Sequence, residues 1–164
     1  MTLKKIIPLV VILFTSCAIN AQDFPNISDP RVPIKLPNVK GDSITLTSLK
    51  GKVILLDFWA SWCIPCRSAN KRLVKLYTKY KSSGFEIFSV SVDESKKDWE
   101  RAIAKDKITW VQVNDPRGVM ASTVIDWNVM VLPTTFLINK KGDVVAVDLE
   151  GKELETALKG LLEE

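Results

Sequence analysis

Residues 53–66 read VILLDFWASWCIPC, and the rest of the chain can be placed from this segment. Its first half is a continuous apolar run interrupted by one acid, Asp57. That length and β-rich composition are typical of a central strand covered on both faces. Its second half brings two cysteines, Cys63 and Cys66, to the point where the strand gives way to a helix predicted over about residues 63–82.

The segments on either side of this stretch alternate between strand and helix patterns. Further strands are predicted at 85–92 and 110–113, with hairpins over 39–49 and over 134–147. Further helices are predicted from Ser95 onward, near 119–126 and over 152–162. Strands that alternate with helices and end in a hairpin and a helix indicate a single α/β domain with a mixed sheet.

Composition excludes several kinds of chemistry. The 164 residues include 23 Lys and Arg, 19 Asp and Glu, three Cys and no His. Without imidazole there is no Ser-His-Asp or Cys-His catalysis and no His-coordinated metal. Three cysteines cannot make a four-thiolate zinc site. We therefore expect no metal and no cofactor. The net charge of +4 is too small to imply nucleic-acid binding.

The N-terminal 21 residues have the layout of an export signal, with two lysines before a nine-residue apolar run that is too short to span a bilayer. Two processing routes stay open: cleavage after Ala21, or lipidation of Cys17 at the end of a lipobox-like sequence. Residues 22–33 are expected to form an extended leader, and residues 34–164 the folded domain. The protein is thus expected to act outside the cytoplasm, where disulfides persist.

The cysteine pair is the most informative motif. Two thiols separated by two residues at a helix start can close a disulfide with little backbone motion. Backbone N–H groups and the positive helix end favour a thiolate at Cys63, which can attack a substrate disulfide, and Cys66 can then resolve the mixed disulfide. Pro65 fits the first helical turn, where its missing N–H has no partner. The alternatives are a structural disulfide, half of a zinc site, and two inert core cysteines.

Residues 57–66 resemble the active-site signature of thioredoxins. The wider pattern, which includes 132–138 and extends over about 34–162, is similar to exported TlpA/ResA-type thiol-disulfide oxidoreductases, especially a Bacteroidetes-like branch. The resemblance implies a thioredoxin-like three-layer sandwich: a mixed central sheet flanked by helices, with an N-terminal β-hairpin and an inserted helix.

The same resemblance implies roles for individual residues. Cys63 would be the attacking thiol, Cys66 the resolving thiol and Asp57 a buried acid near it. Pro133 would follow a cis peptide bond and face the disulfide, with the Leu132 backbone pairing with substrate. The expected substrate-binding residues are Trp62, Ile64, Pro65, Leu132 and Pro133.

Two positions carry independent physical arguments. An isolated carboxylate inside an apolar strand is costly, so burial should raise the pKa of Asp57 and prepare it to exchange a proton with Cys66. By the resemblance, Ala69 stands where many relatives carry a glutamate, so proton transfer would rest on Asp57, with or without water, or would be weaker. Arg67, next to Cys66, is a cation that can bias thiol ionisation.

The leading hypothesis is an exported, monomeric reductase of disulfides in extracytoplasmic proteins, as in cytochrome c maturation, recharged by a membrane-bound electron donor. A disulfide oxidase or isomerase differs from it by redox potential alone. A thiol peroxidase would require Ser or Thr at position 60 and Pro at position 56, where the chain has Ala60 and Leu56. A non-catalytic binding module is the remaining class.

Overall fold

The computed structural model describes residues 24–164. The predicted export signal, with Ala21 and Cys17, lies outside the described residues. Within 24–164, no helix is both long enough and apolar enough to cross a membrane.

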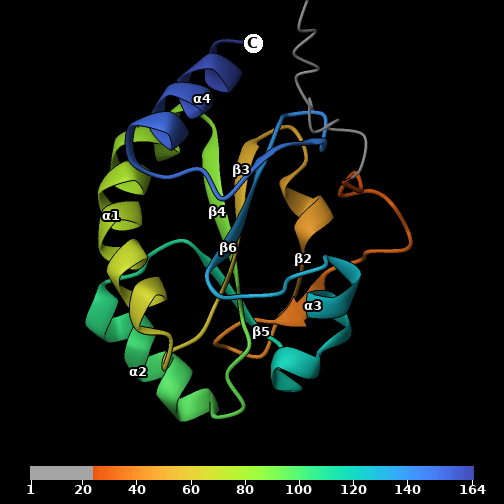
Figure 1. Ribbon diagram of the computed structural model, residues 1–164, viewed down its shortest axis with the longest axis vertical. Coiled ribbons are helices and arrows are strands. Elements are labelled where there is room, and N and C mark those ends of the chain that lie inside the picture. The colour runs from red at the N-terminus through yellow and green to blue at the C-terminus, as the bar shows by residue number, and fades with distance from the viewer. Residues whose placement is uncertain (1–23) are drawn as a thin grey trace, which may run out of the picture.

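A five-stranded mixed sheet forms the centre of the domain, in the order β5-β4-β3-β6-β7 (Figure 1). The strands are β3 (Val53–Trp59), β4 (Phe85–Ser91), β5 (Val111–Asn114), β6 (Thr134–Ile138) and β7 (Val144–Val147). Strands β3, β4 and β5 run parallel, whereas β6 is antiparallel to both β3 and β7. The mixed sheet expected from the sequence is therefore confirmed.

Helices cover both faces of the sheet, as the three-layer prediction requires. Three of them, α1 (Ile64–Tyr80), α2 (Lys96–Asp106) and α4 (Gly151–Glu163), lie on one face (Figure 1). The short α3 (Ser122–Asp126) lies on the other, beside a two-stranded sheet of β1 (Lys35–Pro37) and β2 (Ser43–Thr45). Residues 24–164 also include three 3-10 turns: η2 (Leu46–Leu49), η3 (Lys81–Ser83) and η4 (Gly118–Met120).

Strand β3 is the middle strand of the sheet, and every one of its residues is buried. Successive side chains of a strand point to opposite faces, so Leu55 and Asp57 face α1 while Leu56 and Phe58 face α3. Phe58 accordingly packs against Trp127, just after α3, at a ring-centroid distance of 6.5 Å. This alternation places the single acid of the strand beneath α1.

One predicted element was misplaced and one was confirmed. The hairpin expected over 39–49 begins earlier, because its strands are β1 and β2 and the turn between them is closed by Asn38, whose side-chain oxygen accepts from Lys40 and Asp42 N–H groups. The helix expected over about 63–82 is confirmed as α1, which begins after its N-cap Cys63 and ends at Tyr80.

The segment before β1 has no helix or strand over residues 24–33, yet it packs against the domain. Ile27 and Val32 are buried, and the Ile27 N–H donates to the Gly142 carbonyl in the β6–β7 turn (2.9 Å). Phe24 meets Phe136 edge to face, with ring centroids 5.9 Å apart. These contacts fasten the segment to the sheet.

Candidate active site

The two cysteines form a disulfide at the start of α1, with their Cα atoms 5.3 Å apart. Cys63 is the N-cap residue, and its Sγ accepts a hydrogen bond from the Cys66 backbone N–H (3.2 Å). Pro65 lies in the first turn, where its missing N–H leaves no helical bond unmade. The first sulfur therefore lies beside a backbone donor and the positive end of a 17-residue helix, an arrangement that favours a thiolate after reduction.

The surroundings of the disulfide are apolar and partly exposed. Cys63 and Cys66 are 5% and 1% exposed, so the second cysteine is the deeper one, whereas Trp62 and Ile64 beside them are 61% and 83% exposed. Large apolar side chains in water next to a reactive bond are unusual unless they contact a partner.

A groove of about 600 Å³ runs past the disulfide. Four of the five predicted substrate-binding residues line it, namely Trp62, Ile64, Pro65 and Leu132. The remaining lining, apart from Cys63, is also apolar and comes mainly from η4, α3 and the loop before β6: Val92, Val119, Val124, Val129, Met130 and Val131. Sequence reasoning missed this second wall, because no local pattern links these residues to the cysteines.

The Leu132–Pro133 peptide bond is cis, as predicted. Leu132 lines the groove, but Pro133 lines a separate cavity of about 580 Å³ between α1, the end of β7 and α4. Ala69 lines this second cavity too, and contributes no carboxylate to it. The predicted site residues are thus divided between two neighbouring hollows.

Asp57 is buried beneath α1, with 2% of its surface exposed. Burial raises the pKa of Asp57 to about 6, while a hydrogen bond from Ser89 opposes that rise. The Ser89 hydroxyl donates to Asp57 Oδ2 (2.8 Å) and accepts from the Trp110 indole N–H (2.8 Å). Because Trp110 occupies the acceptor side of this hydroxyl, the Ser89 proton is directed at Asp57.

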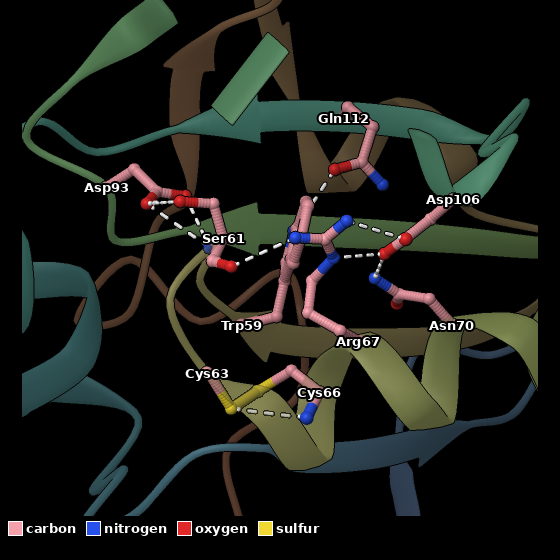
Figure 2. Close-up of polar contacts among 9 residues, drawn as sticks. All are labelled: Trp59, Ser61, Cys63, Cys66, Arg67, Asn70, Asp93, Asp106 and Gln112. Atoms are coloured by element: carbon pink, nitrogen blue, oxygen red, sulfur yellow. Dashed lines mark hydrogen bonds and ion pairs between the residues drawn. A yellow bond between two sulfur atoms is a disulfide. The ribbon is translucent and has the colours of Figure 1, made fainter. Parts of the chain in front are cut away.

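A set of polar contacts surrounds the turn that precedes Cys63 (Figure 2). Asp93, just after β4, accepts hydrogen bonds from the backbone N–H and the hydroxyl of Ser61. Arg67 of α1 donates to the Ser61 carbonyl and to both carboxylate oxygens of Asp106, the last residue of α2. The Arg67 cation is therefore paired, where the sequence suggested only a charge near Cys66.

The sequence offered weak signals for these partners. Asp93, Asp106 and Ser89 are single polar residues far along the chain, and only the parallel pairing of β3 with β4 brings two of them to the site. Asp106 ends a helix, where a lone acid is normally read as a solvated residue. Burial, which the sequence does not display, distinguishes it.

Comparison with known proteins places this arrangement among relatives. The AhpC/TSA family matches residues 27–147. The thiol-disulfide oxidoreductase ResA of Halalkalibacterium halodurans is 36% identical over 117 residues, which cover 71% of this chain and 64% of that protein. ResA of Bacillus subtilis is 38% identical over 113 residues, covering 68% and 61%. The chain thus spans less than two thirds of the length of these two curated relatives.

Solved structures agree with the sequence relatives. A thiol-disulfide oxidoreductase from Bacteroides fragilis superposes with a TM-score of 0.74 at 36% identity, over 79% of this chain and 96% of that one. A thiol:disulfide interchange protein from a Bacteroides species gives 0.73 at 32% identity, over 80% and 87%.

The fold and the helix-capping Cys63–Cys66 disulfide are those of the thioredoxin-like thiol-disulfide oxidoreductases. The chain belongs to the AhpC/TSA family, and within it to the branch of ResA-like thiol-disulfide oxidoreductases.

Proposed function

We propose that this protein is an exported reductase of disulfides in extracytoplasmic proteins. The observation that carries the proposal is a redox pair set at a helix start within an apolar groove: Cys63 is placed to ionise, and Trp62 and Ile64 offer apolar contacts to a polypeptide.

The exchange proceeds in two displacements. The Cys63 thiolate attacks one sulfur of the substrate disulfide, forming a mixed disulfide and releasing the other substrate sulfur as a thiolate, which takes up a proton. The Cys66 thiolate then attacks Cys63 Sγ, which closes the Cys63–Cys66 disulfide and releases the second substrate thiol. Two electrons pass to the substrate, and the protein ends in the disulfide form described above.

Asp57 is the proposed proton acceptor for Cys66. It lies on the sheet face covered by α1, the helix whose first turn holds Cys66. With a pKa raised to about 6, Asp57 can accept the Cys66 proton as the mixed disulfide is resolved and release it later. Position 69 cannot supply a second proton acceptor, because it is Ala69.

The apolar lining of the groove supports a substrate that binds as an extended, apolar polypeptide segment around its cysteine. Leu132 and the apolar residues of η4, α3 and the loop before β6 would contact that segment. We propose a role like that in cytochrome c maturation, which the sequence resemblance to TlpA/ResA-type proteins suggests. The cycle requires an electron donor, which we place in the membrane. The chain would act as a monomer, either free after cleavage at Ala21 or anchored through a lipid on Cys17.

Two measurements test this function. The reduction potential of the Cys63–Cys66 pair, equilibrated against glutathione, should be about −250 mV. A value of about −120 mV would identify an oxidase instead. Cys66→Ser, expressed with its export signal, should trap mixed disulfides with envelope proteins. Cys63→Ser is the matched control and should trap none. Rapid consumption of peroxide by the wild-type protein would favour the thiol peroxidase.

A further inference from the structure

The peptide of Ser61, two residues before Cys63, is held at both of its polar groups (Figure 2). Its N–H donates to Asp93 Oδ2 (2.9 Å), and its carbonyl accepts from Arg67 Nη1 (3.1 Å). The Ser61 hydroxyl adds a third bond, to Asp93 Oδ1 (2.6 Å). A connecting turn that is half-exposed at Ser61 normally leaves such groups to water.

Both anchors of this peptide are themselves fixed. Asp93 is 2% exposed and also accepts from the Ser91 hydroxyl (2.7 Å), so its carboxylate cannot swing away from Ser61. On the other side, Arg67 binds Asp106 with a two-pronged contact, from Nε and from Nη2 (2.7 Å). Asn70, 1% exposed, donates to the same Asp106 carboxylate (3.0 Å).

Arg67 uses its planar guanidinium to join three elements. Nε and Nη2 point to α2, and Nη1 points to the turn before α1, a set of directions that a lysine ammonium on a flexible stem cannot reproduce. The Arg67 side chain is 22% exposed and that of Asp106 only 4%. A charge-assisted pair with so little water around it holds its geometry better than a surface pair does.

The position of Cys63 depends on this turn. The Cys63 N–H donates to the Ala60 carbonyl (3.2 Å), and its Sγ must remain within hydrogen-bond distance of the Cys66 N–H to profit from the helix end. In the disulfide form the S–S bond fixes that distance. After reduction the covalent constraint is gone, and hydrogen bonds alone hold the turn: the backbone bond from Cys63 to Ala60, and the Ser61 contacts with Asp93 and Arg67.

We propose that Arg67, Asp106 and Asp93 are positioning residues, which clamp the Ser61 peptide so that the reduced Cys63 sulfur stays at the N-terminus of α1. The inference rests on the proposed role of Cys63 as the attacking thiol. The clamp works by geometry and not by charge, because the Arg67 cation is balanced by Asp106.

Two variants distinguish a role of the clamp in positioning Cys63 from a role of its charge, because the two roles predict different thiolate fractions. Arg67→Lys keeps the cation but loses the planar guanidinium that binds Asp106 and Ser61 together. Asp106→Asn removes an anion and leaves Arg67 without its ion pair. If the clamp acts by position, both variants reduce the thiolate fraction of Cys63. If charge alone matters, Arg67→Lys resembles the wild type and Asp106→Asn increases the thiolate fraction, since an anion has been removed.

The experiment measures alkylation of the fully reduced protein by iodoacetamide between pH 5 and 10, with mass spectrometry assigning the label to Cys63. We expect both variants to move the alkylation midpoint to higher pH and to slow the reaction at neutral pH by about fivefold, the worth of one hydrogen bond of typical net strength. Arg101→Lys and Asp98→Asn are matched controls, because they make the same changes in an exposed ion pair of α2 (3.0 Å) and should leave the midpoint in place.

A wild-type profile for Arg67→Lys, or a shift of Asp106→Asn to lower pH, would overturn the proposal. If Asp106→Asn fails to fold because Asn70 loses its partner, Arg67→Lys decides alone, since it retains an ion pair at the site. Alkylation requires no protein substrate, so this result stands apart from the potential and trapping measurements that test the reductase function.

Discussion

Replacing Asp57 by Asn should stabilise the protein, and only at a pH where the wild-type carboxyl is ionised. Asparagine has the shape and neutrality of the protonated acid. Burial raises the pKa of Asp57 from 3.8 to about 6, so the folded protein binds this proton more tightly than the unfolded chain does. The stabilisation that comes from the bound proton is complete below pH 3.8 and is lost as pH rises through about 6.

The size of the effect follows from the two pKa values. A difference of roughly two units corresponds to about 3 kcal/mol at full ionisation, at about 1.4 kcal/mol for each unit. Near pH 4 most of that penalty is absent. The difference in unfolding free energy between Asp57→Asn and the wild type should therefore grow by about 2–3 kcal/mol between pH 4 and pH 8.

Guanidinium chloride unfolding of the oxidised proteins at pH 4 and pH 8 measures this difference, with the disulfide removing any thiol titration. Asp98→Asn, which removes a half-exposed acid of α2, is the control for the loss of a carboxylate elsewhere in the domain. An equal effect of Asp57→Asn at both pH values would refute the reasoning, because a buried carboxylate with a raised pKa cannot be neutralised without a pH-dependent gain.

Three further outcomes are expected. Ile64→Ser should slow the reduction of a protein disulfide by about tenfold, through lost apolar contact, while leaving exchange with dithiothreitol unchanged in the same stopped-flow assay. Trp127→Ala should cost about 3–5 kcal/mol in urea unfolding, since this 2%-exposed indole packs on Phe136 and donates to the Val32 carbonyl. Arg72→Ala, which breaks a solvent-exposed ion pair with Glu150, should change stability by less than about 1 kcal/mol in that assay.

Much of the fold and the reactive pair could be predicted because the signals are local. An apolar run with β-rich composition indicates a buried strand wherever it lies, and two cysteines after it, with Pro65 in the next turn, indicate a helix start. The burial of Asp57 could be inferred in the same way, from its apolar neighbours in β3. The first strand of the N-terminal hairpin was missed because it ends at Pro37: proline is disfavoured inside strands, yet an edge strand tolerates one at its end.

The supporting residues could not be found from the sequence, because their meaning depends on tertiary contacts. Ser61 and Asp93 are separated by 32 residues, and Arg67 and Asp106 by 39. A serine, an aspartate or an arginine at such a distance has the same local appearance whether it is solvated or clamped. Only the parallel pairing of β3 with β4, and the packing of α2 beside α1, bring these groups together.

The contacts of residues 24–33 fix the end of the sheet at which the N-terminal side of the chain joins the domain. Ile27 is pinned to the β6–β7 turn. Because β6 runs antiparallel to β3, with Ile138 opposite Ile54, that turn lies at the end of the sheet where β3 begins, whereas Cys63 follows the end where β3 finishes. If the chain is anchored through Cys17, as proposed, the tether would therefore reach the domain at the end of the sheet opposite the disulfide.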